Sequence, residues 1–283
     1  MPTVTGLRIH PVKSLAALRV AAAPVEPWGL AGDRRWMLVD ARGELVSQRQ
    51  LPRLGQFRAA PTDTGGPGSL LVHAPDGQSL LVEPAKGAHR PVTLFGEPLE
   101  TLDAAEDASA WFSRLLGAEL RLVHLDDARR RPSPHPVSLA DGYPVNLAAT
   151  ASLAALNELI AAGHPDDPVK GAPVPMTRFR PNVVVDGTEA WAETGWQRVR
   201  IGGVEFRMAE QCGRCVMTTL DQVTGERRGP EPLRALGRHR KFGRTLGFAM
   251  QLLPVGPPGT IRVGDRLTVL EQGPPPPPEK RYG

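Results

Sequence analysis

The chain has 283 residues, of which 41% are hydrophobic and 23% are charged, as is ordinary for a soluble globular protein. This length suffices for one large or two modest domains with a sizeable hydrophobic core. No apolar run approaches the roughly 18–20 residues of a membrane helix, and the N-terminus lacks the basic and apolar regions of a signal peptide. We therefore expect a cytoplasmic protein that does not span a membrane.

The formal net charge is +4 and the pI is near 9.4, mainly because of arginine, since lysine supplies only 5 of the 34 basic residues. A basic surface can bind nucleic acid, but no basic run is interleaved with aromatic residues and no nucleic-acid motif is present. We expect no nucleic-acid partner. Some of the arginines should instead meet an anionic ligand, because the planar guanidinium suits phosphate.

The first part of the chain is predicted to be rich in strands. Strands are expected at residues 4–12, 35–39, 69–72, 80–82 and 119–124. The turn Pro75-Asp76-Gly77 predicts a hairpin between the third and fourth of these strands. A helix is expected over residues 106–116, where apolar positions fall largely on one face and Gly117 follows as a stop.

Charge clusters and three prolines in residues 126–136 predict a linker or mobile loop between two domains, residues 1–125 and 137–272. Beyond the linker we expect a helix at 150–162, strands at 182–185, 197–201, 204–208 and 261–270, and a turn at Gly202-Gly203. The five prolines within residues 273–283 predict a disordered tail. Because strands dominate and the helices are separated, the predicted fold class is α+β, mostly β, with barrel-like sheets.

The only two cysteines, Cys212 and Cys215, enclose Gly213-Arg214 in a Cys-x-x-Cys motif. This spacing alone is weak evidence, since it also marks redox and half-zinc sites. An arginine beside a cysteine favours the thiolate, which is the form that binds metals and acts as a nucleophile. The seven histidines show no pair at metal-ligand spacing and are predicted to be structural or on the surface. The motif therefore indicates a metal or sulfur-transfer centre at a thiolate.

The flanks of this motif and six further segments resemble the MOSC domain family, the C-terminal domain family of molybdenum cofactor sulfurase. Within it, the likeness is closest to the mitochondrial amidoxime-reducing component and its bacterial relatives. The matching segments, in family order over roughly residues 1–271, are Gly6 to Ser14, Gly32 to Val39, Ser47 to Leu54, Ala140 to Pro144, Phe179 to Asn182, Arg214 to Gly225 and Pro258 to Asp265.

The resemblance implies a β-rich N-terminal domain packed on a barrel-like MOSC domain. It also implies a molybdenum-cofactor oxidoreductase (the cofactor being Mo-molybdopterin) that reduces small N-hydroxylated compounds by removing oxygen. The chain has no spare cysteines for a cluster of its own, so we expect a separate electron donor, a ferredoxin or a flavin reductase. Two alternatives stay open: a sulfur carrier with a persulfide on Cys215, and a protein that binds the cofactor without turnover.

The site residues implied by the resemblance begin with Cys215 as the molybdenum ligand, since soft thiolates suit such a metal. Arg180 is expected to bind the cofactor's phosphate and Asn182 a pterin edge. Lys13 and Ser14 are expected to bind the same ligand from the N-terminal domain.

Three further positions complete the expected site. In an alternating strand only one of two neighbours faces a ligand, and of Arg34 and Arg35 we expect Arg35 to do so. Arg214 and Thr218 are expected to support the cofactor site.

Three positions stay open. Asp141 is equally consistent with a substrate-positioning residue and with a turn cap. Cys212 could pair with Cys215 on oxidation, tune the site or do nothing. Phe248-Ala249 departs from the polar pair that the family often has near the cofactor.

Overall fold

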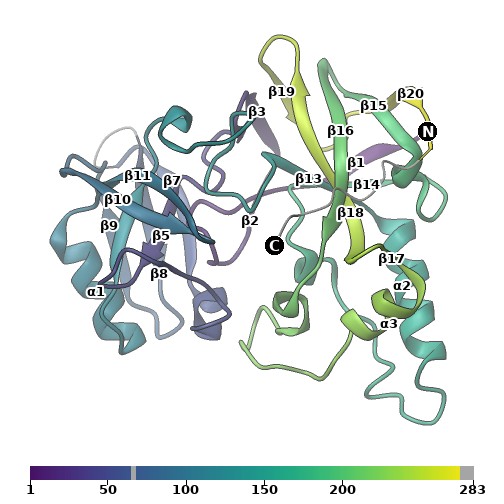
Figure 1. Cartoon of the computed structure of the whole chain (residues 1–283), viewed down its shortest axis with the longest axis horizontal. Coiled ribbons are helices and arrows are strands. Elements are labelled where there is room, and N and C mark those ends of the chain that lie inside the picture. The colour runs from purple at the N-terminus through teal and green to yellow at the C-terminus, as the bar shows by residue number, and fades with distance from the viewer. Residues whose placement is uncertain (65–67, 275–283) are drawn as a thin grey trace.

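The computed structural model describes residues 1–64 and 68–274, which form two lobes (Figure 1). Strands predominate in both lobes, and the described residues contain three α-helices. This confirms the predicted α+β, mostly β class. Within the described residues, no helix is long and apolar enough to cross a membrane.

One lobe consists of residues between Trp36 and His124 and lies to the left in Figure 1. Its elements are β5 (Trp36–Val39), β6 (Leu45–Val46), η1 (Pro52–Gln56), β7 (Arg58–Thr62), β8 (Ser69–His73), β9 (Ser79–Val82), β10 (His89–Leu94), β11 (Glu97–Asp103), α1 (Glu106–Leu116) and β12 (Arg121–His124). A five-stranded sheet has the order β10-β11-β12-β5-β6, and β7-β8-β9 form a second sheet. Helix α1 buries Trp111 and Phe112 against Phe57 in the core between them.

The other lobe contains the remaining strands and two α-helices. Its elements are β1 (Thr3–Ile9), β2 (Leu18–Val20), β3 (Ala22–Glu26), β4 (Gly29–Leu30), β13 (Val145–Ala149), α2 (Thr150–Ala162), η3 (Met176–Phe179), β14 (Val183–Asp186), η4 (Ala192–Gly195), β15 (Trp196–Ile201), β16 (Val204–Gly213), η5 (Val216–Thr219), α3 (Leu233–His239), β17 (Lys241–Phe242), β18 (Thr245–Val255), β19 (Gly259–Arg262) and β20 (Leu267–Gln272); η2 (Ala128–Arg130) lies in the connection between the lobes.

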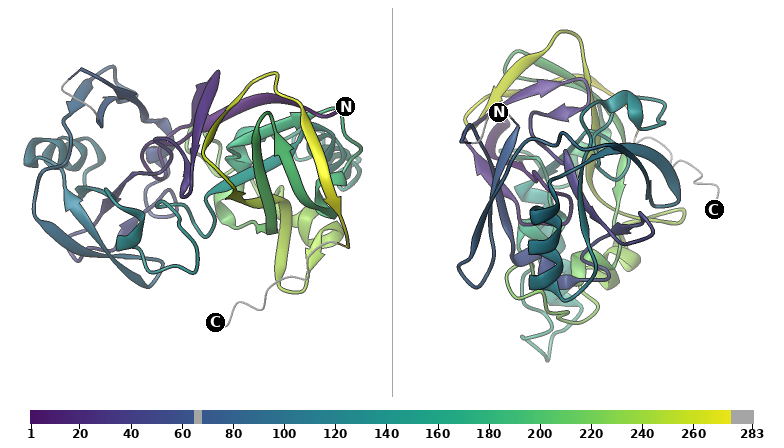
Figure 2. Two further views of the ribbon diagram at one scale, coloured as in Figure 1. Left: turned by 90° about the horizontal axis from the view of Figure 1, so that it is seen from above. Right: turned by 90° about the vertical axis from the view of Figure 1, so that its left-hand side faces the viewer.

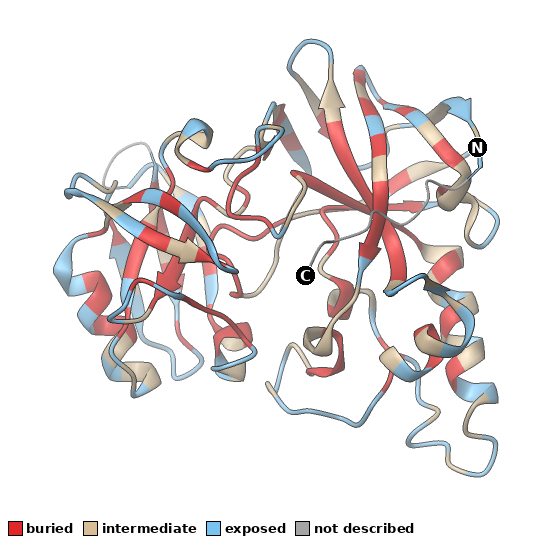
Figure 3. Ribbon diagram, in the orientation of Figure 1, coloured by how far each residue is buried: buried red, intermediate tan, exposed pale blue. Residues whose placement is uncertain are grey.

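The large sheet of this lobe has the order β2-β1-β14-β13-β18-β16-β15-β20. Its far ends meet at a bridge between Thr3 and Arg266, so the sheet curls into a barrel-like form (Figure 2). The barrel interior is apolar, and β13, β14, β16 and β18 are buried along most of their length (Figure 3).

The chain's first strands belong to the second lobe, although residues 1–125 were expected to form one N-terminal domain. Strand β1 pairs antiparallel with β14, and β3 pairs with β19. Val4, Leu7 and Val25 are buried in the same core as residues of β13 and β16. Between β1 and β2, however, Val12 and Leu15 pack in the core of the first lobe, and the chain passes fully into that lobe after β4. The segments that join the lobes lie next to each other, since Leu125 N donates to Arg35 O at 2.8 Å.

The predicted helices are confirmed with the bounds expected, and so are the hairpins at Pro75-Asp76-Gly77 and Gly202-Gly203. The single strand predicted over 261–270 is wrong. It is two strands, β19 and β20, because the chain turns at Gly264, whose φ is +94°.

The predicted linker, residues 126–136, contains a side chain that fixes it to the rest of the molecule. Arg131 is buried and donates from Nη1 to the carbonyls of Ser138 and Ala140, both at 2.5 Å. A buried guanidinium with carbonyl partners is an anchor, so this connection is held rather than loose. The disordered tail predicted for 273–283 lies mainly outside the described residues, of which the last are Gly273 and Pro274.

Candidate functional site

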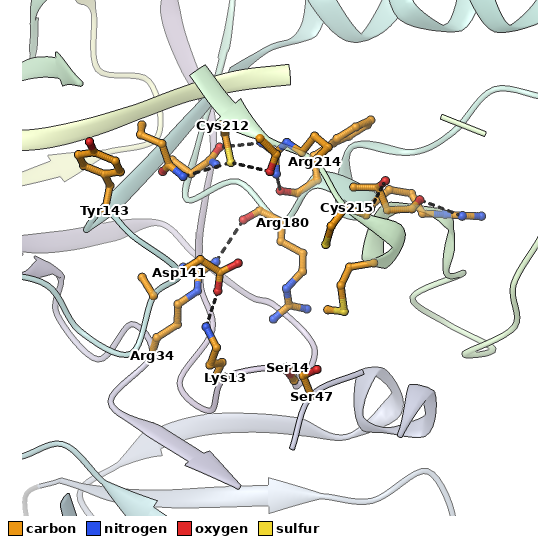
Figure 4. Close-up of a pocket in the computed structure, with 18 of the residues that line it drawn as sticks. Lys13, Ser14, Arg34, Ser47, Asp141, Tyr143, Arg180, Cys212, Arg214 and Cys215 are labelled. Atoms are coloured by element: carbon orange, nitrogen blue, oxygen red, sulfur yellow. Dashed lines mark hydrogen bonds and ion pairs between the residues drawn. The ribbon is translucent and has the colours of Figure 1, made fainter. Parts of the chain in front are cut away.

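A cavity lies where the two lobes meet, and the Cys-x-x-Cys motif forms one of its walls (Figure 4). Side chains from the segment after β1 approach from one side, and those from β13, the segment just before β14 and the end of β16 approach from the other. The lining includes Lys13, Ser14, Arg34, Ser47, Arg49, Phe95, Asp141, Tyr143, Asn146, Arg178, Arg180, Asn182, Cys212, Arg214, Cys215, Met217, Thr218 and Gln251. Residues about 200 positions apart in the sequence thus share one cavity.

The two cysteines have different environments. Cys212 lies within β16 and is buried, and Gln251 Nε2 donates to its sulfur at 3.1 Å. Burial raises the pKa of the Cys212 thiol, against the opposing effect of Arg214, so this sulfur is a neutral thiol. Cys215 follows β16, is half-buried and lines the cavity, and Arg49 Nη2 lies 3.3 Å from its Sγ. Cys215 is therefore the sulfur available to a ligand.

Arg214 holds the motif in place through backbone carbonyls. Its guanidinium donates to Phe248 O at 2.8 and 2.7 Å and to Phe179 O at 2.8 Å. The ring of Phe248 stacks on Phe179 with centroids 3.9 Å apart, in the core behind the site. Phe248-Ala249 is the pair at which this chain departs from the family pattern. The Phe248 side chain packs away from the cavity, and the Phe248 backbone carbonyl positions Arg214.

Thr218 supports Cys215 by a backbone contact. Its hydroxyl donates to Cys215 O at 2.9 Å within the 3-10 turn η5. Arg178 donates to Thr218 O at 3.3 Å, so an arginine holds this turn from the far side. These contacts fix the direction in which the Cys215 side chain leaves the backbone.

The cavity concentrates positive charge away from water. Lys13 is buried and donates to Leu139 O at 2.8 Å and to the Asp141 carboxylate. Arg180 donates to Leu15 O at 2.7 Å, and burial together with the neighbouring charge of Arg34 lowers its pKa to about 9. Like charges held together at low dielectric repel each other strongly. The cluster is therefore suited to an anionic ligand, which would relieve that repulsion.

Arg34 lines this cavity, whereas Arg35, which the sequence favoured, does not. Strand alternation does not apply, because Arg34 lies in the turn before β5 with φ +51°. Its guanidinium contacts Asp33, Asn182 Oδ1 at 3.2 Å and Arg180 O at 3.4 Å. Arg35 instead stacks on Trp28, its Cζ 3.3 Å from the ring centroid, and pairs with Glu26.

Asn182 reaches the cavity wall, but protein groups occupy most of its amide. Its Oδ1 accepts from Arg34 and from Asn146 N, and its Nδ2 donates to Arg8 O at 3.1 Å. The side chain therefore positions Arg34. Asp141, left open from the sequence, faces the cavity and holds Lys13. Ser14 is buried in the cavity wall with φ +73°.

Protein side chains offer few metal ligands here. Among the residues that the structure describes, His, Cys, Asp and Glu nowhere gather in groups of three or more that could hold a metal ion. A metal bound to Cys215 would need its other ligands from a cofactor, as in a dithiolene complex. The donor set therefore fits one soft sulfur ligand beside a cationic cradle for an anion.

Three further residues line the cavity without having been expected from the sequence: Arg49, Phe95 and Arg178. Arg49 lies within the Ser47-to-Leu54 segment, which resembles the family, so it could have been predicted as a site residue. Arg178 precedes the Phe179-to-Asn182 segment directly and could have been included with it. Nothing in the sequence pointed to Phe95 as a site residue, because a Phe-Gly pair indicates only a turn.

Comparison with known families decides the relationship. Residues 1–119 match the MOSC N-terminal beta barrel domain, and residues 134–268 match the MOSC domain. The chain belongs to the MOSC family. Both parts of the family's architecture are present, and the cavity described above lies between residues of both matched regions.

Curated relatives of this MOSC protein fall into two groups. It is 31% identical to the human mitochondrial amidoxime-reducing component 1, over 95% of this chain and 83% of the relative. It is also 31% identical to the molybdenum cofactor sulfurase of Danio rerio, over 87% of this chain but only 31% of that longer protein. Among solved structures, the YuaD protein of Bacillus subtilis has a TM-score of 0.39 at 12% identity, over 94% of each chain.

Proposed function

We propose that this protein is a molybdenum-cofactor oxidoreductase that removes oxygen from small N-hydroxylated compounds. The observation that supports this most is the position of Cys215: a half-buried sulfur in the same cavity as the buried cations Lys13 and Arg180. The likeness to the amidoxime-reducing component over most of both chains supports the reaction class.

Different residues of the cavity would hold different parts of this cofactor. Cys215 would ligate molybdenum, and Lys13, Arg34 and Arg180 would neutralise the phosphate, with Ser14 as a hydroxyl partner. Asn182, Arg214 and Thr218 act as positioning residues through the contacts described above. When bound, the cofactor supplies the two-electron oxygen-atom transfer, while the chain orients it.

Electrons would come from a separate protein, which we propose is a ferredoxin or a flavin reductase. Both cysteines of the chain lie at the cavity, which leaves none for a cluster of the four-cysteine kind. Arg234, Arg238, Lys241 and Arg244 are exposed on α3 and the adjoining β17 hairpin, and none forms an ion pair within the described chain. Such a surface favours encounter with an acidic partner.

The two cysteines provide a matched pair of variants for the test. Cys215→Ala should abolish reduction of an amidoxime with an artificial electron donor and remove the thiolate ligand seen by X-ray absorption at the molybdenum edge. Cys212→Ala should keep most of the activity, and the loss of its buried sulfur should cost about 1–2 kcal/mol of stability. Equal loss of activity in both variants would show that the roles are assigned wrongly.

A further inference from the structure

The turn between β10 and β11 carries a residue that the backbone does not favour. Phe95 and Gly96 connect Leu94 and Glu97, and both have positive φ, +55° and +85°. Two-residue hairpin turns of this kind prefer Asn-Gly or Asp-Gly, because both central residues are left-handed. A left-handed conformation is strained for a residue with a Cβ.

Phe95 is also unfavourable as a surface residue, since its side chain is 46% exposed. Asparagine would suit both the turn and the solvent. A residue that is unfavourable in two independent ways at a cavity rim is a candidate for function.

The ring of Phe95 lines two adjoining hollows. One is the cavity of Cys215; the other is an outer hollow lined by Glu44, Leu45, Ser47, Arg49, Gln50 and Phe95. Arg49 lies between them, with its Cζ 5.2 Å from the Phe95 centroid and its Nη2 3.3 Å from Cys215 Sγ. A molecule in the outer hollow would therefore contact Phe95 and Arg49 and lie next to the sulfur-bearing end of the cavity.

We propose that the outer hollow is the substrate subsite and that Phe95 gives it a preference for planar, aromatic N-hydroxylated compounds. This inference rests on the proposed function. The exposed ring offers a stacking face. Arg49 offers N–H donors to the substrate oxygen.

Benzamidoxime and acetamidoxime form the matched probe pair, because both carry the same uncharged amidoxime and only the first carries an aromatic ring. Binding to the oxidised holoprotein would be measured by calorimetry without an electron donor, and KM and kcat with an artificial donor. The variants are Phe95→Asn, Phe95→Trp and Arg49→Gln, with Val169→Asn as a control for loss of an exposed apolar side chain remote from the cavity lining.

Phe95→Asn should raise Kd and KM for benzamidoxime about 3- to 10-fold, as loss of one stacking contact predicts, and should raise those for acetamidoxime less. Phe95→Trp should restore the preference, and Arg49→Gln should weaken both ligands to a similar degree. The melting temperature of Phe95→Asn should stay level or rise, because asparagine suits the turn. Val169→Asn should match the wild type throughout.

Equal effects of Phe95→Asn on the two probes, or none, would overturn the inference. Loss of bound pterin in Phe95→Asn would also overturn it, because Phe95 would then belong to the cofactor site. Binding of benzamidoxime that depends on Phe95 but leads to no turnover would refute the proposed function and leave the subsite standing. Turnover of benzamidoxime that is unchanged in Phe95→Asn would support the proposed function and refute the subsite.

Discussion

Arg34 and Arg35 are sequence neighbours with opposite surroundings. Arg34 faces the cationic cavity and contacts Asn182, whereas Arg35 stacks on Trp28 and pairs with Glu26. The sequence favours Arg35 only if both residues belong to a strand. The positive φ of Arg34 breaks the alternation, and one sequence without its backbone angles does not reveal such a turn.

This contrast gives a paired prediction for cofactor binding. Arg34→Gln should weaken cofactor retention about 10- to 100-fold, since a charge-assisted hydrogen bond contributes about 1.5–3 kcal/mol. Arg35→Gln should retain the cofactor and lower the free energy of unfolding by about 1–2 kcal/mol, because it loses the Trp28 contact. Pterin fluorescence after gel filtration and urea unfolding measure the two effects. Loss of pterin in Arg35→Gln alone would contradict this placement of the two arginines.

At the scale of elements, local signals predicted what local interactions determine. Helices α1 and α2 were predicted with correct bounds, because an apolar face and a following glycine are both local features. The strand over 261–270 was not, since an apolar pattern continues across the Gly264 turn. The pairing of β1 with β14 was also out of reach, because it joins residues about 180 positions apart.

Two glycines with positive φ allow the cost of backbone strain to be measured separately from the cost of a packing clash. Gly77 has φ +89° and open space where a Cβ would lie, whereas a Cβ on Gly29, φ +121°, would lie 2.7 Å from Pro144 O. Gly77→Ala should cost about 1 kcal/mol through its φ alone, and Gly29→Ala about 2–3 kcal/mol. Equal losses in chemical denaturation would show that the β4 hairpin does not pack tightly on the Pro144 segment next to the cavity.

For the whole molecule, the partly buried His124 and the buried His10 make stability depend on pH. Burial lowers the pKa of His124 to about 4, with Arg35 adding to this and Asp126 opposing it, and burial also lowers the pKa of His10. An unfolded histidine has a pKa near 6.5, so between about pH 6.5 and 4 the unfolded chain binds more protons than the folded one. Stability therefore falls as the pH falls through this window.

Unfolding in urea at pH 7 and pH 5 tests this dependence. We expect the free energy of unfolding to be about 1–2 kcal/mol lower at pH 5 than at pH 7 because of His124 alone. His124→Phe should reduce that loss while keeping an aromatic ring against Trp36, whose centroid lies 4.4 Å away. His89→Gln changes an exposed histidine and should leave the loss intact. An unchanged pH dependence in His124→Phe would rule out this histidine as its source.

The cavity between the lobes could be predicted from the sequence only through the family resemblance. Its composition could be anticipated from motifs around Lys13, Arg180 and Cys215, but their meeting depends on how β1, β14 and β16 are ordered in one sheet. The central claim is that this cavity holds a molybdenum cofactor on Cys215.

The most direct test is the amount of molybdenum and pterin in protein purified from a cofactor-competent host. We predict about one of each per chain, both strongly reduced in Arg180→Gln, where the cradle for the anion loses a buried guanidinium. Persistent absence of both, together with a cyanide-releasable sulfur on Cys215, would contradict the account and identify the protein as a sulfur carrier.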